Sequence, residues 1–147
     1  MGDTTTFPSI NPLDGGREGV ILNLIAGGTI KAGQVVAFNA TGVAKTVEAC
    51  NGETTTAPIG VALYDATTGQ RVAVASTGSV VTVCEGPGAG CDAGDLVGPD
   101  DAAVLGCVKT VTSAASASVI GIALDDISAN GTGQILVQPF YLSKAAS

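Results

Sequence analysis

The sequence predicts an all-β fold: a single compact β-barrel or β-tulip-like domain built from two duplicated β-units. Little or no helix is expected, and an extended N-terminal arm precedes the domain. First, residues 58–83 alternate apolar and small positions with the period of two typical of strands, and no stretch sustains a helical period. Second, apolar residues make up 46% of the chain but aromatics only 3%, and 21 glycines supply turns. The core must therefore consist of small and β-branched side chains, which favour sheets.

The third observation is an internal repeat. The phrase PIGVALYD at 58–65 returns as VIGIALDD at 119–126, and AGQVV at 32–36 returns as AGDLV at 93–97. Both phrases align without a gap when Ala93 is placed on Ala32. We call this constant distance along the sequence the repeat offset. Such a repeat is one supersecondary unit used twice, so each unit is expected to bury its open face on the other.

Residues 1–18 are predicted to form the arm, because prolines and a glycine pair argue against regular structure there. Phe7, Ile10 and Leu13 are spaced apolar residues in this otherwise polar segment. We expect them to anchor the arm on a neighbouring chain, each contributing about 1.5–3 kcal/mol if buried. The alternative is a disordered terminus.

A single β domain is predicted over 19–147, with repeat units at about 29–83 and 90–138. Before residue 58 we expect strands over 19–25 and 43–49, a turn that enters a second strand over 29–38, and a polar loop over 50–57. Residues 58–83 then give strand, loop, strand, turn and strand. The glycine-rich segment 84–92 leads into the second unit. In the tail, Phe140, Tyr141 and Leu142 are expected to seal the core or to contact a neighbouring subunit.

Charge and hydropathy exclude two classes of partner. The net charge is −7, and the six basic residues are scattered along the chain. Nucleic-acid binding needs a basic patch, so no direct contact with DNA or RNA is predicted. No apolar run reaches the roughly 20 residues of a membrane span, and the N-terminus lacks a signal peptide, so no membrane association is expected.

The chain has no histidine, which removes the usual general base and the commonest metal ligand. Asp65 and Asp126 occupy equivalent repeat positions. They could act as a carboxylate pair, but an aspartate after a strand more often caps the following turn, and we favour that interpretation. We predict no catalytic residue, cofactor or metal.

An acidic cluster surrounds one loop of the second unit. Calcium prefers oxygen ligands of this kind, but the spacing fits no EF-hand, and we favour a solvated acidic surface. The cluster comprises Asp92, Asp95, Asp100 and Asp101.

The four cysteines contain no C-x-x-C pair, which argues against a zinc ribbon. Cys84 and Cys91 bracket a short glycine-rich loop. A disulfide between them is the pairing we predict, and it would stabilise the fold by roughly 2–3 kcal/mol. Cys50 and Cys107 are expected to be buried small apolar side chains.

The repeated phrases carry a family resemblance. AGQVV at 32–36, PIGVALYDATTGQ at 58–70, VAVASTG at 72–78 and IGIAL at 120–124 stand in the order of a known pattern. They resemble the capsid decoration (cement) proteins of tailed viruses. More narrowly, they resemble the small head-associated family long described only as a domain of unknown function. The resemblance covers about residues 19–138, and the long arm and the four cysteines depart from the family pattern.

The resemblance implies a homotrimer on the outer surface of an icosahedral capsid, at local three-fold positions, where it stabilises the shell. Its partners would be the major capsid protein and itself, and it would be made in the host cytoplasm and located on the virion surface. The family offers no catalytic residues to transfer. The alternative is an extracellular filament or surface-layer subunit joined by strand exchange. An enzyme or a sugar-binding module using the acidic loop residues is a third reading. A biotinyl or lipoyl carrier domain is disfavoured, because no lysine lies in a tight hairpin with a flanking methionine.

Overall fold

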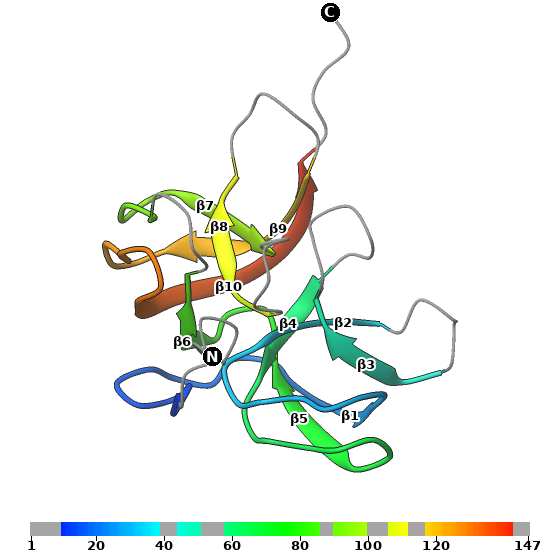
Figure 1. The fold of residues 1–147 in the computed structure, drawn as a ribbon. Coiled ribbons are helices and arrows are strands. Elements are labelled where there is room, and N and C mark those ends of the chain that lie inside the picture. Colours follow the sequence, from blue (N-terminus) through cyan, green and yellow to red (C-terminus); the bar gives the residue numbers. More distant parts are fainter. Residues whose placement is uncertain are drawn as a thin grey trace, which may run out of the picture.

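The computed structural model describes residues 10–38, 44–50, 58–85, 90–99, 106–111 and 117–142. These residues form strands and turns without a helix, which confirms the predicted all-β fold (Figure 1). Within these ranges no helix is long and apolar enough to cross a membrane. The strands are β1 (Ile21–Ala26), β2 (Val35–Phe38), β3 (Thr46–Ala49), β4 (Pro58–Ala62), β5 (Arg71–Ala75), β6 (Val80–Cys84), β7 (Leu96–Pro99), β8 (Val108–Thr110), β9 (Ala117–Ala123) and β10 (Thr132–Leu142).

The first five strands, which we call the first unit, form a closed barrel in the order β1-β3-β2-β4-β5. Antiparallel pairing joins every neighbour except β1 and β3, which pair in parallel and complete the ring. The contact that completes it aligns Ile25 with Thr46 and Ala26 with Val47. A barrel has no free strand edge, so this unit offers little backbone for pairing with other chains.

The last five strands, the second unit, form a sheet in the order β6-β10-β9-β7-β8. This order matches that of the first unit, with β6 in the place of β1 and β8 in the place of β3. Between β6 and β8, however, the ladder is reduced to one parallel bridge, from Glu85 to Val108. The second unit is therefore a sheet with the same strand order, and among the described residues one bridge is the pairing between its first and last strands, a junction that we call the seam.

The strand registers confirm the internal repeat. Val35 pairs with Val61 in the first unit, and Leu96 pairs with Ile122 in the second, each residue displaced by the repeat offset. The turn glycines Gly33 and Gly94 have φ angles of 93° and 94°, a conformation that L side chains rarely adopt. Two units with the same registers and turns are one structural element used twice.

The sheets divide the chain differently from the predicted unit boundaries. The predicted first unit includes residues 80–83, but β6 pairs with β10 in the second. In the first unit Leu22 pairs with Val74, and in the second Val81 pairs with Ile135, so Val81 is the counterpart of Leu22. The distance along the sequence from β1 to β6 is therefore shorter than the repeat offset. The loop after β6 is correspondingly longer than the loop after β1, and this insertion breaks the gap-free alignment.

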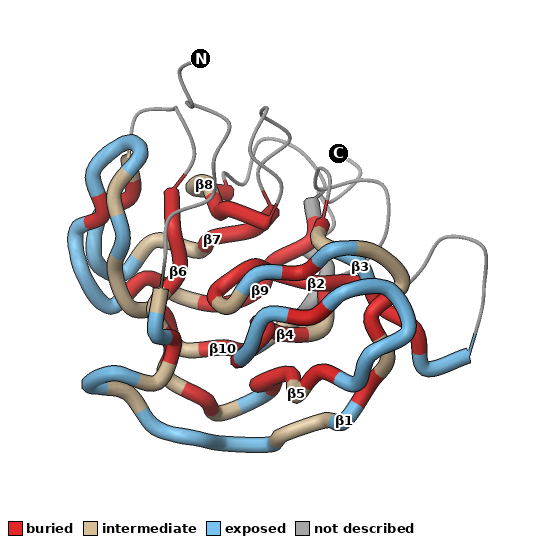
Figure 2. The backbone as a smooth tube through the Cα atoms, turned by 60° about the horizontal axis from the view of Figure 1, so that its bottom comes forward, coloured by how far each residue is buried: buried red, intermediate tan, exposed pale blue. Residues whose placement is uncertain are grey.

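Two main apolar clusters form the core, and most buried backbone lies along the strands (Figure 2). One cluster fills the first barrel, with Ile30, Val36 and Val47 among its buried residues. The larger cluster joins the interior of the second unit to the outside of the first. The contact between the units runs through β4, which approaches both β9 and β10.

Candidate functional site: the closure of the second unit

The aspartates in equivalent repeat positions cap turns. The Asp65 carboxylate accepts a hydrogen bond from the Ala32 backbone N–H at 2.8 Å, and Asp126 accepts one from Ala93 at 2.9 Å. Each bond ties the end of one strand to the turn before its partner strand in the same unit. The predicted cap of the turn following the same strand is therefore wrong in its partner: each carboxylate caps the turn before the neighbouring strand, and each serves the fold of its own unit.

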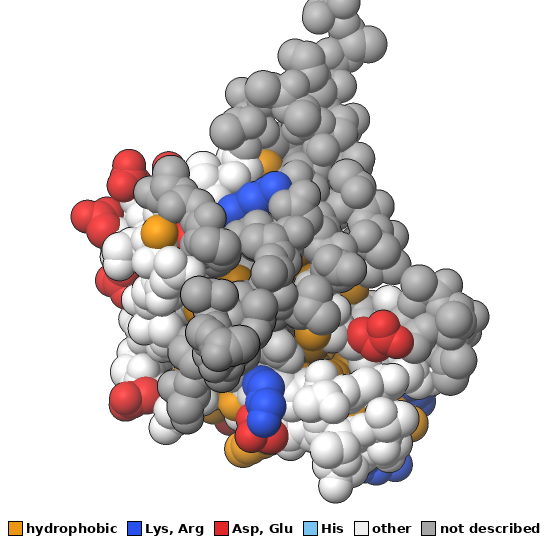
Figure 3. All heavy atoms as spheres, in the orientation of Figure 1, with side chains coloured by type: hydrophobic (Ala, Val, Ile, Leu, Met, Phe, Trp, Pro, Cys, Tyr) orange, Lys and Arg blue, Asp and Glu red, His pale blue; other side chains and the backbone are white. Residues whose placement is uncertain are grey.

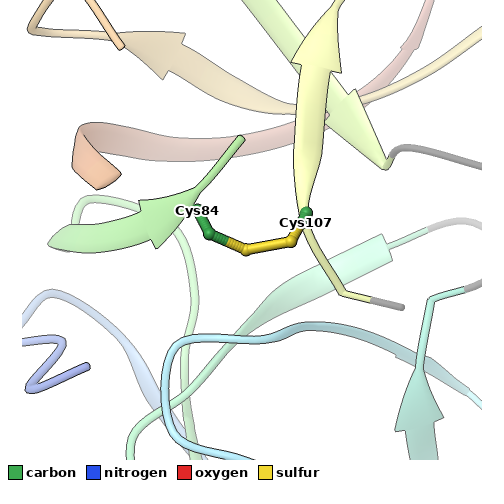
Figure 4. Close-up of a disulfide and its surroundings, with 2 residues drawn as sticks. All are labelled: Cys84 and Cys107. Carbon is green, nitrogen blue, oxygen red and sulfur yellow. A yellow bond between two sulfur atoms is a disulfide. The ribbon is translucent and has the colours of Figure 1, made fainter. Parts of the chain in front are cut away.

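The predicted disulfide between Cys84 and Cys91 is wrong: Cys84 pairs with Cys107, with a Cα–Cα distance of 4.9 Å (Figure 4). Cys84 ends β6 and Cys107 immediately precedes β8. Their repeat counterparts, Ile25 and Thr46, are paired residues on the seam of the first barrel. The strand order therefore brings Cys84 beside Cys107, and a covalent bond crosses the seam where the first unit has a parallel ladder.

Cys91 instead lies in the interior of the second unit, where its backbone is bridged to Ile127. Cys50 and Cys91 are the free cysteines among the described residues, and both are buried. The predicted burial of Cys50 is confirmed. Cys107 is buried as predicted, but it is oxidised rather than a free thiol.

A carboxylate lies inside the second unit next to the seam. Glu85 is 2% exposed and occupies the position that Ala26 has in the first unit. The Cys91 thiol donates a long hydrogen bond, 4.0 Å, to Oε2 of Glu85. Burial raises the pKa of this thiol, and a hydrogen bond with Thr110 lowers it in part. The seam of the second unit thus holds a buried carboxylate at the position where the first has Ala26.

The N-terminal segment, residues 10–17, covers the exposed edge of β6. Arg17 and Val80 exchange backbone hydrogen bonds of 3.0 and 2.9 Å, and the Thr82 N–H donates to the Pro12 carbonyl at 2.9 Å. This edge has no β-ladder with β8, so the segment satisfies backbone groups that the first barrel pairs internally.

Two of the three predicted arm anchors belong to this segment. Ile10 packs against the Cys84–Cys107 disulfide, and Leu13 packs against the larger core cluster. A Cβ built on Gly33 would lie 2.9 Å from the Ile10 side chain, so Ile10 also touches the first unit. Both side chains are half-buried on their own chain. Phe7 lies outside the described residues.

The tail residues Phe140, Tyr141 and Leu142 continue β10, and their backbones pair with 117–119 of β9. Their side chains lie outside the described part of the structure, so the predicted seal or subunit contact stays a prediction.

The acidic loop is held by internal hydrogen bonds. Asp95 Oδ2 accepts from the Asp92 N–H at 2.9 Å and from the Thr110 hydroxyl at 3.2 Å. Asp100 and Asp101 fall outside the described residues. No group of three or more metal-ligating side chains occurs among those that are described. Figure 3 shows acidic side chains gathered along the left of the molecule, over the loops of the second unit.

Sequence reasoning missed the seam and Glu85, because both depend on which strands are neighbours. A usable signal was present: Cys107 stands one repeat offset after Thr46, which belongs to the strand pair that completes the first barrel.

Comparisons with known proteins identify a family and a similar fold. A family model described as phage cement protein matches residues 16–139. The fold is similar to the crystal structure of the head fiber gp8.5 N base in bacteriophage phi29, with a TM-score of 0.58 and 18% sequence identity over 87% of this chain and 98% of that chain. At that identity the likeness concerns the fold alone. No curated protein matches the sequence.

Proposed function

The chain belongs to the phage cement protein family, and from this premise we propose that it binds the outer surface of an assembled, expanded icosahedral capsid and stabilises it. The observation that carries the proposal is the extent of the family match, which includes every strand of the first unit and nearly all of the second. Family and fold together support a capsid-associated structural role. The finer assignment, a homotrimer at local three-fold positions, is part of our proposal.

The physical properties of the molecule suit such a role. A cement protein needs rigidity and surfaces complementary to its neighbours rather than a reactive centre. The barrel, the disulfide across the second seam and the paired N-terminal segment all restrict backbone motion. Because many copies occupy one shell, a modest free energy per contact accumulates over the particle. The net charge of −7 would keep decorated particles apart in solution.

The partners we propose are the major capsid protein and other copies of this chain, on the exterior of the virion, after synthesis in the host cytoplasm. We propose no enzymatic activity, no cofactor and no direct contact with nucleic acid or membrane. Phe7 remains a proposed anchor on a neighbouring chain or on the capsid. We retain Ile10 and Leu13 as contacts of the arm, although both also support their own chain. Phe140, Tyr141 and Leu142 are proposed subunit contacts.

The binding proposal is tested with expanded shells assembled without a decoration protein. Purified protein is added, unbound chains are removed by sedimentation, and the bound stoichiometry and the melting temperature of the shell are measured. We expect saturable binding and a higher melting temperature. The control for non-specific adhesion to the shells is the same measurement with protein that has been unfolded, reduced and alkylated. Absence of saturable binding to any expanded shell of the cognate virus would refute the proposal.

The arm is tested separately by deleting residues 2–9, which leaves the described segment 10–17 in place on β6. We expect weaker shell binding with an unchanged midpoint of urea unfolding. Phe7→Ala is the single-residue counterpart and should reproduce part of the loss. Equal affinity of the shortened and full-length chains would remove the arm from the binding surface.

A further inference from the structure

The duplicated units are alike in fold but unequally covered. On the outside of the first unit, six apolar residues are buried in the cluster shared with the second unit. The counterparts of Ala37 and Cys50, which are Gly98 and Val111, are buried as well. The other four residues are Val35, Val61, Leu63 and Ala75. Their counterparts on the second unit, one repeat offset later, are Leu96, Ile122, Leu124 and Leu136. We call each set the outer face of its unit.

Among the described residues, the outer face of the second unit is more exposed than that of the first, although Leu96 packs against Val111 and Val119. Leu124 is 44% exposed, whereas Leu63 is 6% exposed. The other three counterparts are half-buried, whereas Val35, Val61 and Ala75 are fully buried. Every residue of this face is apolar and at least as large as its counterpart. A face that met only water would favour polar side chains, so these residues indicate a contact surface.

The opposite asymmetry occurs where the units meet. Val81 and Ile120 of the second unit are fully buried in the shared cluster. Their counterparts Leu22 and Ile59, which we call the open end of the first unit, are only partly buried. Within one chain, the outer face of the first unit therefore covers the open end of the second. Among the described residues, no equivalent packing covers the outer face of the second unit or the open end of the first.

We infer that these two surfaces bind each other between chains: the outer face of the second unit of one copy docks on the open end of the first unit of the next copy. The occupant is a second copy of this chain, because the contact repeats one that the chain already makes internally between matching surfaces. The interface is head-to-tail, so it joins two different surfaces and can close into a ring of chains. The inference deepens the self-association in the proposed function, and its test needs no capsid.

The test uses mass measurement by light scattering or native mass spectrometry across a range of protein concentrations. We expect the wild-type chain to self-associate and Leu124→Asp to weaken the association at least about tenfold, because an apolar contact is replaced by a buried charge. Tyr64→Asp is the matched control. Tyr64 is 63% exposed, and its repeat counterpart is already aspartate, Asp125. This variant should associate like the wild type.

Mixing two variants distinguishes a head-to-tail interface from a two-fold one. Leu124→Asp lacks a working outer face but keeps the open end, and Ile59→Gln has the reverse defect. Each alone should be monomeric, and an equimolar mixture should form a 1:1 dimer with one intact junction. Leu22→Gln replaces Ile59→Gln if the latter lowers the urea midpoint.

Three results would overturn the inference: a wild-type chain that is monomeric at every concentration, a Leu124→Asp variant that associates normally, or a mixture that forms no dimer. If Leu124→Asp weakens binding to shells but leaves the solution mass unchanged, the outer face serves the capsid instead. Failure of the wild-type chain to bind shells, with the mixing result intact, would refute the proposed function and leave this interface standing.

Discussion

Among single residues, the two cysteines of the disulfide have a large expected effect on stability. The disulfide spans 23 residues of sequence, so the chain-entropy relation assigns it about 3 kcal/mol. We expect Cys84→Ser/Cys107→Ser to lower the free energy of unfolding by about that amount in urea titrations. Adding a reductant should lower the stability of the wild type but not that of the double variant. Cys91→Ser should keep the sensitivity to reductant.

A thiol count gives an independent check of the pairing. In denaturant without reductant, the oxidised chain should react with two equivalents of a thiol reagent, from Cys50 and Cys91. After reduction it should react with four. Peptide mapping that recovered a Cys84–Cys91 bridge would contradict the structure.

Burial raises the pKa of Cys50 from its ordinary 9.0 to about 12. Above pH 9 the unfolded chain loses this proton while the folded chain keeps it, so stability is lost as the pH rises from 9 toward 12. The slope from one such group approaches about 1.4 kcal/mol per pH unit. Cys50→Ala should therefore flatten the fall in unfolding free energy between pH 9 and 11. If the free energy of unfolding of this variant fell with pH as steeply as that of the wild type, the Cys50 thiol would be in contact with water.

The capping aspartates form a matched pair in the two units. Asp65→Ala and Asp126→Ala each remove one hydrogen bond to a backbone N–H, and we expect a loss of about 1 kcal/mol in each case. Asp14→Ala, at an exposed position, should change stability by less than about 0.5 kcal/mol. Unequal losses for the two caps would show that the repeat is not energetically equivalent.

At the level of elements, the sequence was informative wherever one unit could be aligned on the other. The repeat offset placed Asp65 and Asp126 in equivalent positions, and the registers of β2–β4 and β7–β9 agree. The kinship of β1 and β6 was missed, because a short insertion follows β6 and neither strand repeats a recognisable phrase. The disulfide was missed for the same reason, since its partners adjoin strands that are distant in sequence.

The docking of the N-terminal segment can be tested with the paired turn glycines. Gly33 and Gly94 share nearly the same φ, but a Cβ at Gly94 would meet open space, whereas one at Gly33 would meet Ile10. Gly94→Ala should cost about 1–3 kcal/mol from backbone strain alone, and Gly33→Ala should cost more. In an Ile10→Ala background the difference should shrink, which a double-mutant cycle in urea measures. An unchanged difference would mean that Ile10 does not rest on Gly33.

For the whole molecule, composition and repeats predicted the fold class, and the resemblance of the repeated phrases to a known family predicted the family. Neither predicted the unequal roles of the units. Leu63 and Leu124 stand in almost identical phrases, and only the packing of one unit on the other buries the first and exposes the second. That asymmetry arises from the path of the chain between the units, which no local pattern encodes.

The bond between Cys84 and Cys107 also makes the closure of the second unit depend on the redox conditions around the protein. Reducing compartments such as a bacterial cytoplasm keep thiols reduced. If the chain is made there, as we propose, the bridge from Glu85 to Val108 and the N-terminal segment would hold the second seam before the disulfide forms. Exposure to an oxidising medium would then form the disulfide across the seam. In the proposed setting, the bond across the second seam would therefore form only after release from the host.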